Sequence, residues 1–339
     1  MRARDLSHKR PRVYVTRGLP GDAVQRLGSR ADVTVWPGED RPPYEVLRQE
    51  AARSDGLVTL LTDSIDAALL ESAPQLRVVS NVATGHDNID LEAATAAGIA
   101  VTNTPGVLEE TTADLAFALL LAIARRVTEG ERFLRAGSWT SWSPTLLLGT
   151  DVHGATLGII GLGATGAAMA RRARGFGMRV IYHSRTAKPD LERELGLEKV
   201  ELDELLRTAD FVSLHTSLNS ETRGLIGARE IGLMGRNAYL INTARGALVD
   251  QEALSRALER GDLAGAALDV FADEPLPADD RLRKLNNVVL TPHIGSASVA
   301  TRSRMAAMAV DNCLAALDGR VPPNCLNPEV FRRAPVSVR

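Results

Sequence analysis

The sequence has few cysteines, few aromatic residues and no apolar run long enough to span a membrane. Its two cysteines, Cys313 and Cys325, lack the spacing of a metal site or of a disulfide framework. The longest apolar run covers only residues 115–124, which is too short to cross a bilayer. No apolar segment follows the basic residues at the N-terminus, so they do not predict a signal peptide. Together these absences favour a cytoplasmic protein that does not enter a membrane.

The sequence also lacks a strong excess of charge and a cluster of metal ligands. Its formal net charge is −2 and its only dense basic stretch is residues 2–12, which argues against nucleic acid as the main partner. His86, His153, His183 and His215 show no metal-ligand spacing with one another or with the cysteines, so we expect no metal. A length of 339 residues with 45% hydrophobic residues leaves room for two globular domains.

Strand-like and helix-like segments alternate in two separate series. Such alternation predicts parallel sheets with helices on both faces, so the expected fold is α/β with two doubly wound, Rossmann-like or flavodoxin-like domains. The pair Pro105-Gly106 ends the first series, and the second begins near residue 155. The predicted strands are 12–16, 33–36, 56–61, 77–82 and 100–102 in the first series, and 155–160, 179–183, 211–214, 238–242, 265–269 and 288–290 in the second.

Two helical stretches lie outside these series. The first is predicted as one long helix from about residue 109 to 136, and its central part is apolar nearly all round. A helix of that kind must be buried on several sides, either between domains or between subunits. The second, about 299–317, could return to close the first domain, which would make that domain discontinuous.

A glycine-rich turn lies between a predicted strand and a predicted helix. It consists of Gly161, Leu162, Gly163, Ala164, Thr165 and Gly166. In a dinucleotide site the first glycine permits the turn, the second lets a pyrophosphate approach the backbone, and the third lets the helix pack on the strand. The spacing alone is a weak signal, because such glycines can be purely structural, but the flanking strand and helix favour a dinucleotide site.

The end of the second strand in this series indicates which dinucleotide is preferred. Ser184, Arg185 and Thr186 stand where an NAD site carries an acidic residue, and no carboxylate follows until Asp190. A guanidinium can grip a 2′-phosphate with two parallel hydrogen bonds. We therefore expect NADP(H) to be preferred and NAD(H) to be possible, with a solvated surface turn as the alternative interpretation.

Three polar residues follow predicted strands in the second series. Arg245, Glu274 and His293 each could be an ordinary surface or loop residue, but together with a nicotinamide they form a coherent set for reducing a 2-oxo acid. An arginine can pair with a carboxylate and polarise a ketone, and a histidine can protonate the developing alkoxide. A carboxylate beside the histidine favours its protonated form and fixes its orientation.

These motifs resemble the D-isomer-specific 2-hydroxyacid dehydrogenase family, and within it the glyoxylate/hydroxypyruvate reductases. The resemblance rests also on four further segments, residues 81–90, 101–108, 112–121 and 139–142, and covers about residues 12–328. It implies NADPH-dependent reduction of small 2-oxo acids, glyoxylate to glycolate and hydroxypyruvate to D-glycerate. It also implies a substrate-binding domain made of residues 1–104 and 295–339, an NAD(P)-binding domain of residues 105–294, and a homodimer that uses the long helix.

The resemblance further implies roles for individual residues. Arg245 would bind the substrate carboxylate and carbonyl, His293 would be the acid/base, and Glu274 would orient it. Trp142 would reach the neighbouring subunit's site or else anchor a loop on its own domain. The other implied substrate-binding residues are Leu60, Leu61, Ala83, Thr84 and Gly85. Besides the glycine turn and residues 184–186, the implied cofactor-binding residues are Thr112, Thr216, Thr243, Ala244, Asp269, His293, Gly295 and Ser296.

The sequence departs from the family pattern at two positions and leaves other functions open. Ala164 stands where a basic residue often lies near the pyrophosphate, and Ser217 replaces a common proline. A dehydrogenase of another D-2-hydroxy acid, or of phosphite, is one alternative on the same fold. A dinucleotide-sensing, corepressor-like binding protein is an alternative of another class, although the intact Arg–Glu–His set argues against it.

Overall fold

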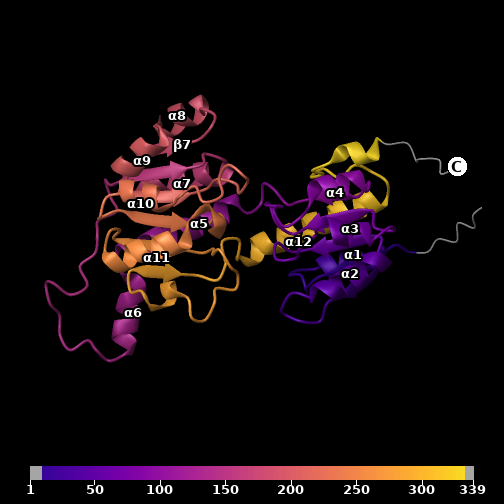
Figure 1. The fold of residues 1–339 in the computed structure, drawn as a ribbon, viewed down its shortest axis with the longest axis horizontal. Helices are drawn as coiled ribbons and strands as arrows, with labels where there is room; N and C mark the ends of the chain where they lie inside the picture. Colours follow the sequence, from indigo (N-terminus) through magenta and orange to yellow (C-terminus); the bar gives the residue numbers. More distant parts are fainter. Residues whose placement is uncertain (1–9, 333–339) are drawn as a thin grey trace, which may run out of the picture. The chain divides into compact units, whose positions relative to one another are not determined.

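The computed structural model describes residues 10–332. Residues 2–9 of the basic N-terminal stretch therefore lie outside the described residues. Within residues 10–332 the chain forms two compact units (Figure 1). The first contains residues 10–108 and 298–332, and the second contains residues 109–297. The chain therefore enters the second unit after Leu108 and returns to the first at Ser298, which makes the first unit discontinuous.

The first unit is built on a five-stranded parallel sheet with the order β2-β1-β3-β4-β5. This order is the one found in flavodoxin-like folds. Side chains alternate between its faces, so Val13 and Val15 lie in one hydrophobic cluster and Tyr14 in the other. The strands are β1 (Arg12–Val15), β2 (Asp32–Val35), β3 (Gly56–Thr59), β4 (Val78–Asn81) and β5 (Ala100–Thr102).

Helices cover both faces of this sheet. α12 (Val299–Leu317) begins at the cap Ser298 and packs against β3, β4 and α1, so this C-terminal helix belongs to the first unit. Figure 1 shows this helix among the indigo and violet N-terminal elements. The other helices are α1 (Ala23–Gly28), α2 (Tyr44–Arg53), α3 (Ala67–Glu71) and α4 (Leu91–Ala96), with a short 3-10 helix at Pro328–Phe331.

The second unit is built on a seven-stranded parallel sheet with the order β12-β11-β10-β9-β6-β7-β8. The strand order reverses between β6 and β9, which is the arrangement of a dinucleotide-binding sheet. The sequence predicted six of these strands and missed β8 (Glu198–Lys199), because its two residues are charged and exposed. The others are β6 (Thr156–Ile160), β7 (Arg179–His183), β9 (Phe211–Leu214), β10 (Tyr239–Asn242), β11 (Gly265–Leu268) and β12 (Val288–Leu290).

Two buried clusters lie on the two faces of this sheet. One includes residues of α5 (Glu109–Ala124) and α7 (Ala164–Gly175), and the other includes residues of α9 (Leu202–Thr208) and α11 (Gln251–Arg260). The remaining helices are α6 (Val127–Arg135), α8 (Pro189–Leu195) and α10 (Ala228–Leu233), with 3-10 helices at Gly246–Leu248 and Arg281–Lys284. Among the described residues no helix is both long and apolar enough to span a membrane.

The single helix expected over 109–136 is wrong, because the structure breaks it into α5 and α6. Arg126 has a φ of 53°, in the left-handed region, between the two helices. The carbonyl of Ala124 accepts a hydrogen bond from the N–H of Thr150, at 2.9 Å. The guanidinium of Arg126 binds Glu129, at 2.7 Å, and the carbonyl of Leu148, at 3.3 Å. A later segment of the chain therefore caps α5, and α6 projects from the unit (Figure 1).

Candidate active site

Three neighbouring strands of the second unit end next to the predicted catalytic residues. Arg245 follows β10, Glu274 follows β11 and its loop, and His293 follows β12. These strands are adjacent in the order β12-β11-β10, and all run parallel, so their carboxyl ends lie on one edge of the sheet. Open α/β sheets bind their ligands at this edge.

Glu274 and His293 form a hydrogen-bonded pair. Nδ1 of His293 lies 2.7 Å from Oε2 of Glu274, and the N–H of Phe271 donates to Oε1 at 3.0 Å. Burial alone would raise the pKa of Glu274, but the hydrogen bond and charge of His293, together with Phe271 and Arg245, lower it below its usual range. Glu274 is thus a carboxylate at neutral pH that holds Nδ1 and leaves Nε2 of His293 for a ligand.

Asp269 holds the loop that carries His293. Its carboxylate is buried and accepts from the hydroxyl of Thr291 at 2.6 Å and from the N–H groups of Ile294 and Gly295 at 2.8 and 2.7 Å. His293 itself has a φ of 53°, a conformation that a side chain rarely adopts without support. Burial raises the pKa of Asp269 against the opposing effect of these donors. The family resemblance implies a cofactor contact for Asp269, and the structure adds this anchoring role.

Arg245 is placed by the residues around the end of β10. The side-chain amide of Asn242 donates to the carbonyl of Arg245 at 2.9 Å, and its oxygen accepts from the N–H of Ala244 at 3.0 Å. Gly246 lies so close to the backbone of Phe271 that an added Cβ would be 1.9 Å from it. The residue after Arg245 must therefore be glycine, and this close approach holds Arg245 beside the loop of Glu274.

The glycine turn has the geometry that its sequence predicted. Gly161 has a φ of 95°, and a Cβ there would lie 2.6 Å from the N–H nitrogen of Thr216. A Cβ on Gly166 would lie 2.2 Å from the carbonyl oxygen of Gly161, so the third glycine allows α7 to pack closely. Gly163 has nothing within 4 Å of its Cβ position. This open glycine at the start of α7 is where a phosphate can approach backbone N–H groups.

Other predicted cofactor residues lie near this turn or near the His293 loop. Thr243 directly follows β10, and its buried hydroxyl has no hydrogen-bond partner among residues 10–332, so it is available to a ligand. Thr112 of α5 lies beside Gly295, where an added Cβ would be 3.4 Å from its methyl group. Leu162 is only 2% exposed and packs into the core, so any ligand contact from it must use its backbone. The donors and the open glycine fit a dinucleotide.

The segment predicted to select the 2′-phosphate lies at the end of β7. The hydroxyl of Ser184 donates to the carbonyl of Thr186 at 2.7 Å, which holds the turn. Arg185 is exposed, and its guanidinium lies 3.5 Å from the carboxylate of Glu221. The sequence does not indicate a role for Glu221, because it belongs to a turn after β9 and no local pattern connects the two residues.

The predicted substrate residues of the first unit lie on two loops at the carboxyl edge of its sheet. Leu60 and Leu61 follow β3, and the loop Ala83–Gly85 follows β4. The carbonyl of Ala83 accepts from the N–H of Thr104 at 2.9 Å. Both loops therefore lie at the edge that binds ligands in open parallel sheets.

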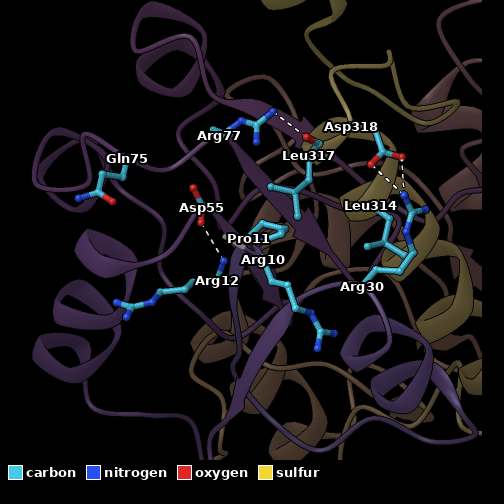
Figure 2. A pocket seen from close by; sticks show the side chains of 10 residues that line it. All are labelled: Arg10, Pro11, Arg12, Arg30, Asp55, Gln75, Arg77, Leu314, Leu317 and Asp318. Carbon is cyan, nitrogen blue, oxygen red and sulfur yellow. Dashed lines mark hydrogen bonds and ion pairs between the residues drawn. The ribbon is translucent and has the colours of Figure 1, made fainter. Parts of the chain in front are cut away.

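A cavity of about 610 Å³ lies at the opposite, amino edge of that sheet (Figure 2). It is lined by Arg10, Pro11, Arg12, Arg30, Asp55, Gln75, Arg77, Leu314, Leu317 and Asp318. Arg30 and Asp318 form an ion pair there, with two N–O distances of 3.0 and 3.1 Å. None of the predicted site residues lines this cavity, so the strand-end loops remain the candidate site.

We expect His215 to make the stability of the second unit depend on pH. Burial lowers its pKa from 6.5 to about 4, and its Nε2 lies 2.8 Å from the hydroxyl of Ser213. Because the unfolded chain binds the proton more readily, stability is lost as the pH falls from 6.5 towards 4. We expect a loss of about 2 kcal/mol at pH 5 relative to pH 7.

Urea unfolding at pH 7 and pH 5 checks this loss against His215→Gln. The glutamine can still bond to Ser213 but cannot titrate. The free energy of unfolding of this variant should therefore fall by about 2 kcal/mol less between pH 7 and pH 5 than that of the wild-type protein. An equal fall for the two proteins would show that His215 does not contribute.

The geometry of the second unit indicates a class of protein. A glycine turn and a topological switch point mark a dinucleotide-binding domain, and an arginine with a carboxylate–histidine pair marks an acid–base site beside it. In the described part of the chain no group of three or more His, Cys, Asp or Glu residues could hold a metal ion. A dinucleotide-binding sheet with an acid–base pair at its carboxyl edge is typical of a nicotinamide-dependent oxidoreductase.

Comparisons with known proteins identify the family. A family model described as "D-isomer specific 2-hydroxyacid dehydrogenase, NAD binding domain" matches residues 117–295. A glyoxylate reductase of Korarchaeum cryptofilum is 52% identical over 327 residues, which cover 96% of this chain and 98% of that protein. One of Aeropyrum pernix is 51% identical over 328 residues, covering 96% and 98%. The chain belongs to the D-isomer-specific 2-hydroxyacid dehydrogenase family and is an NAD(P)-dependent oxidoreductase.

Solved structures agree with the fold. A protein of Thermus thermophilus has a TM-score of 0.88 and 52% identity, covering 93% of this chain and 99% of that one. An NADPH-dependent glyoxylate/hydroxypyruvate reductase of Sinorhizobium meliloti, in complex with NADP and malonate, has a TM-score of 0.83 and 32% identity. The match covers 96% of this chain and 99% of that one. The predicted α/β fold with two parallel sheets is thus confirmed.

Proposed function

We propose that this protein reduces glyoxylate and hydroxypyruvate to the corresponding 2-hydroxy acids and prefers NADPH. The observation that carries the proposal is the Glu274–His293 pair, at 2.7 Å, on the same sheet edge as Arg245. The names of the relatives described above support glyoxylate as a substrate, and the NADPH-dependent reductase of Sinorhizobium meliloti supports hydroxypyruvate.

The residues of the second unit divide the chemistry among them. The bound dihydronicotinamide supplies the hydride. Arg245 binds the oxo-acid carboxylate and polarises the ketone with its planar fork of N–H donors. His293, protonated and held at Nδ1 by Glu274, donates the proton from Nε2 to the ketone oxygen as negative charge develops there. The carboxylate of Glu274 stabilises the imidazolium before that transfer.

We assign substrate binding to the first unit and cofactor binding to the second. The backbone N–H groups of the loop Ala83–Gly85 would bind the substrate carboxylate, as anion-binding nests do. Leu60 and Leu61 would contact the group attached to the keto carbon and so favour small substrates. The Gly161–Gly166 turn with Thr112, Thr216, Thr243, Ala244, Gly295 and Ser296 would bind the dinucleotide.

We also propose a homodimer formed through the projecting segment after α5. This segment exposes large apolar side chains, among them Leu134, which is 58% exposed, and Trp142, which is 77% exposed. A second subunit packed on this segment would remove these side chains from water. The exposure of Trp142 argues against a role as an anchor on its own domain and supports one in a neighbouring subunit. Sedimentation equilibrium checks the dimer, and a monomer at micromolar concentration would refute it.

The rate of NADPH oxidation with glyoxylate, hydroxypyruvate, a bulkier 2-oxo acid and no acid tests the proposed activity. We expect turnover with the two small acids, and slower turnover with the bulky one. Turnover with the bulky acid alone, or phosphite-dependent reduction of NADP in the reverse direction, would place the protein elsewhere in its family.

Arg185→Ala tests the cofactor preference. We expect the KM for NADPH to rise about 10- to 100-fold, because a charge-assisted contact with the 2′-phosphate is lost, while the KM for NADH stays nearly constant. Glu221→Gln should lower the KM for NADPH, since it removes the negative charge 3.5 Å from Arg185. Initial rates with both cofactors measure these changes.

Arg193→Ala is the matched control. Arg193 is an exposed arginine on the neighbouring α8, and it pairs with Asp190 at 2.5 Å. The Arg193→Ala variant should change neither the KM for NADPH nor the KM for NADH. An equal rise for both cofactors in Arg185→Ala would mean that Arg185 does not recognise the 2′-phosphate.

A further inference from the structure

One buried carboxylate lies at the base of the loops assigned to the substrate. Asp63 has a side chain that is only 1% exposed, and donors from three residues surround it. Its Oδ1 accepts from the guanidinium of Arg17 at 3.1 Å. Its Oδ2 accepts from the hydroxyl of Thr16 at 2.5 Å and from the N–H of Leu60 at 2.8 Å. The carboxylate therefore ties the end of β1 to the first residue after β3.

The network continues from this turn to the second loop. The side-chain amide of Asn88 donates to the carbonyls of Leu60, at 3.2 Å, and of Asp63, at 2.9 Å. Its oxygen accepts from the amide of Asn81 at 3.3 Å, and that same amide donates to the carbonyl of Gly85 at 3.0 Å. One connected set of hydrogen bonds thus joins the Leu60–Asp63 turn to the Ala83–Gly85 loop.

Arg17 holds the carboxylate from the other side. Besides Asp63, its guanidinium donates to the hydroxyl of Thr62 at 3.0 Å and to the carbonyl of Glu39 at 3.3 Å. Its side chain is 14% exposed, so both partners of this ion pair are largely removed from water. Such a pair gains little net stability over apolar residues of the same volume, because desolvation offsets the attraction. Its directional bonds do, however, restrict where the two loops can lie.

We propose that Asp63 is a positioning residue for the substrate, with Arg17 as its counter-ion. It sets the backbone of Leu60 directly, and it sets the Ala83–Gly85 loop through Asn88 and Asn81. This inference rests on the proposed function, since it takes these loops to be the ones that bind the oxo acid. Neither Asp63 nor Arg17 needs to touch the substrate for this role.

Asp63→Asn in the full-length protein tests the proposal. The asparagine keeps the shape but loses the charge, and its NH₂ group meets the donors of Arg17 or Thr16. We expect the KM for glyoxylate to rise about 10- to 100-fold, because small misplacements of a binding group have effects of this size. The kcat should stay within about threefold, and the dissociation constant for NADPH should not change, because the acid–base pair and the glycine turn belong to the other unit.

Hydrogen exchange gives a readout that does not depend on turnover. In Asp63→Asn the amides of Ile65, Ile89 and Thr104 should exchange about 10-fold faster, because they donate to the carbonyls of Asn88, His86 and Ala83 in the loop that the Asp63 network holds. Amides of the central strands β1 and β3 should keep their protection. Faster exchange over the whole unit, together with a raised KM, would indicate a merely structural role and overturn the proposal.

Asp318→Asn is the matched control. Asp318 also pairs with an arginine in the first unit, but it lies at the cavity on the opposite edge of the sheet (Figure 2). Asp318→Asn should leave both the KM for glyoxylate and the exchange of the Ile65, Ile89 and Thr104 amides at wild-type values. A similar change in both variants would show that loss of any ion pair in this unit is sufficient, and would overturn the proposal.

The outcomes separate this inference from the proposed function. If the wild-type protein reduces no oxo acid, the proposed function fails, and the exchange of the Ile65, Ile89 and Thr104 amides still decides whether Asp63 positions the loop. If the wild-type protein is active and Asp63→Asn leaves the KM unchanged, only this inference fails. Should Asp63→Asn not fold, Arg17→Lys keeps the charge but loses the fork, and its KM should rise about 3- to 10-fold; an unchanged KM there also overturns the proposal.

Discussion

His293→Ala is expected to lower kcat for glyoxylate reduction about 10³-fold while the dissociation constant for NADPH changes less than about twofold. General acid catalysis contributes about 10²- to 10⁴-fold, and without the imidazole the developing alkoxide must take its proton from water. Binding of NADPH should persist, because the glycine turn and the backbone of the His293 loop are unchanged. Stopped-flow turnover and fluorescence titration with NADPH measure the two quantities.

Two further variants test the same assignment: Glu274→Gln changes the partner of His293, and His153→Ala is the control. The glutamine can still bond to Nδ1 of His293 but cannot stabilise the imidazolium, so we expect a smaller loss of kcat, about 10²-fold. His153 is an exposed histidine of the same unit for which no role is predicted, so its replacement should leave kcat unchanged. Wild-type turnover in His293→Ala would refute the assignment of the acid.

The parallel sheets could be predicted because their strands are buried on both faces. β9, β10 and β11 are fully buried, and each appears in the sequence as a short apolar run. β8 could not be predicted in this way, since Glu198 and Lys199 are charged and exposed and pair with β7 only through their backbone. The break after α5 was missed for a related reason: the group that caps it, the N–H of Thr150, is distant in sequence from Ala124.

The same distinction holds for the site. Glu274 and His293 could be predicted as a pair because each follows a strand, and parallel strands end on a common edge. The side-chain contacts that hold the site residues in place could not be predicted from the sequence. Asp269 binds three groups of the His293 loop, Asp63 joins two loops of the first unit, and Glu221 lies opposite Arg185, all through side-chain bonds between distant segments. A periodic pattern reports burial and register, whereas these bonds depend on the folded backbone.

Arg245→Lys is expected to lower kcat/KM for glyoxylate about 10²-fold, and Arg245→Ala about 10⁴-fold. The lysine retains the positive charge but cannot present two parallel N–H donors to a carboxylate, so orientation is lost while attraction remains. The alanine removes both the ground-state contact with the carboxylate and the polarisation of the carbonyl, so KM should rise and kcat should fall together. Initial-rate measurements over a range of glyoxylate concentrations separate the two parameters.

Arg236→Lys is the control for the chemistry of this substitution. Arg236 belongs to the same unit, pairs with Asp262 at 3.1 Å and is 75% exposed, so the same exchange there should leave kcat/KM unchanged. If Arg245→Ala weakened NADPH binding but left the KM for glyoxylate intact, Arg245 would be a cofactor residue. A fall in both kcat and substrate affinity, with NADPH binding retained, would place the guanidinium at the reacting carbonyl, because only there does one group affect the bound ground state and the transition state at once.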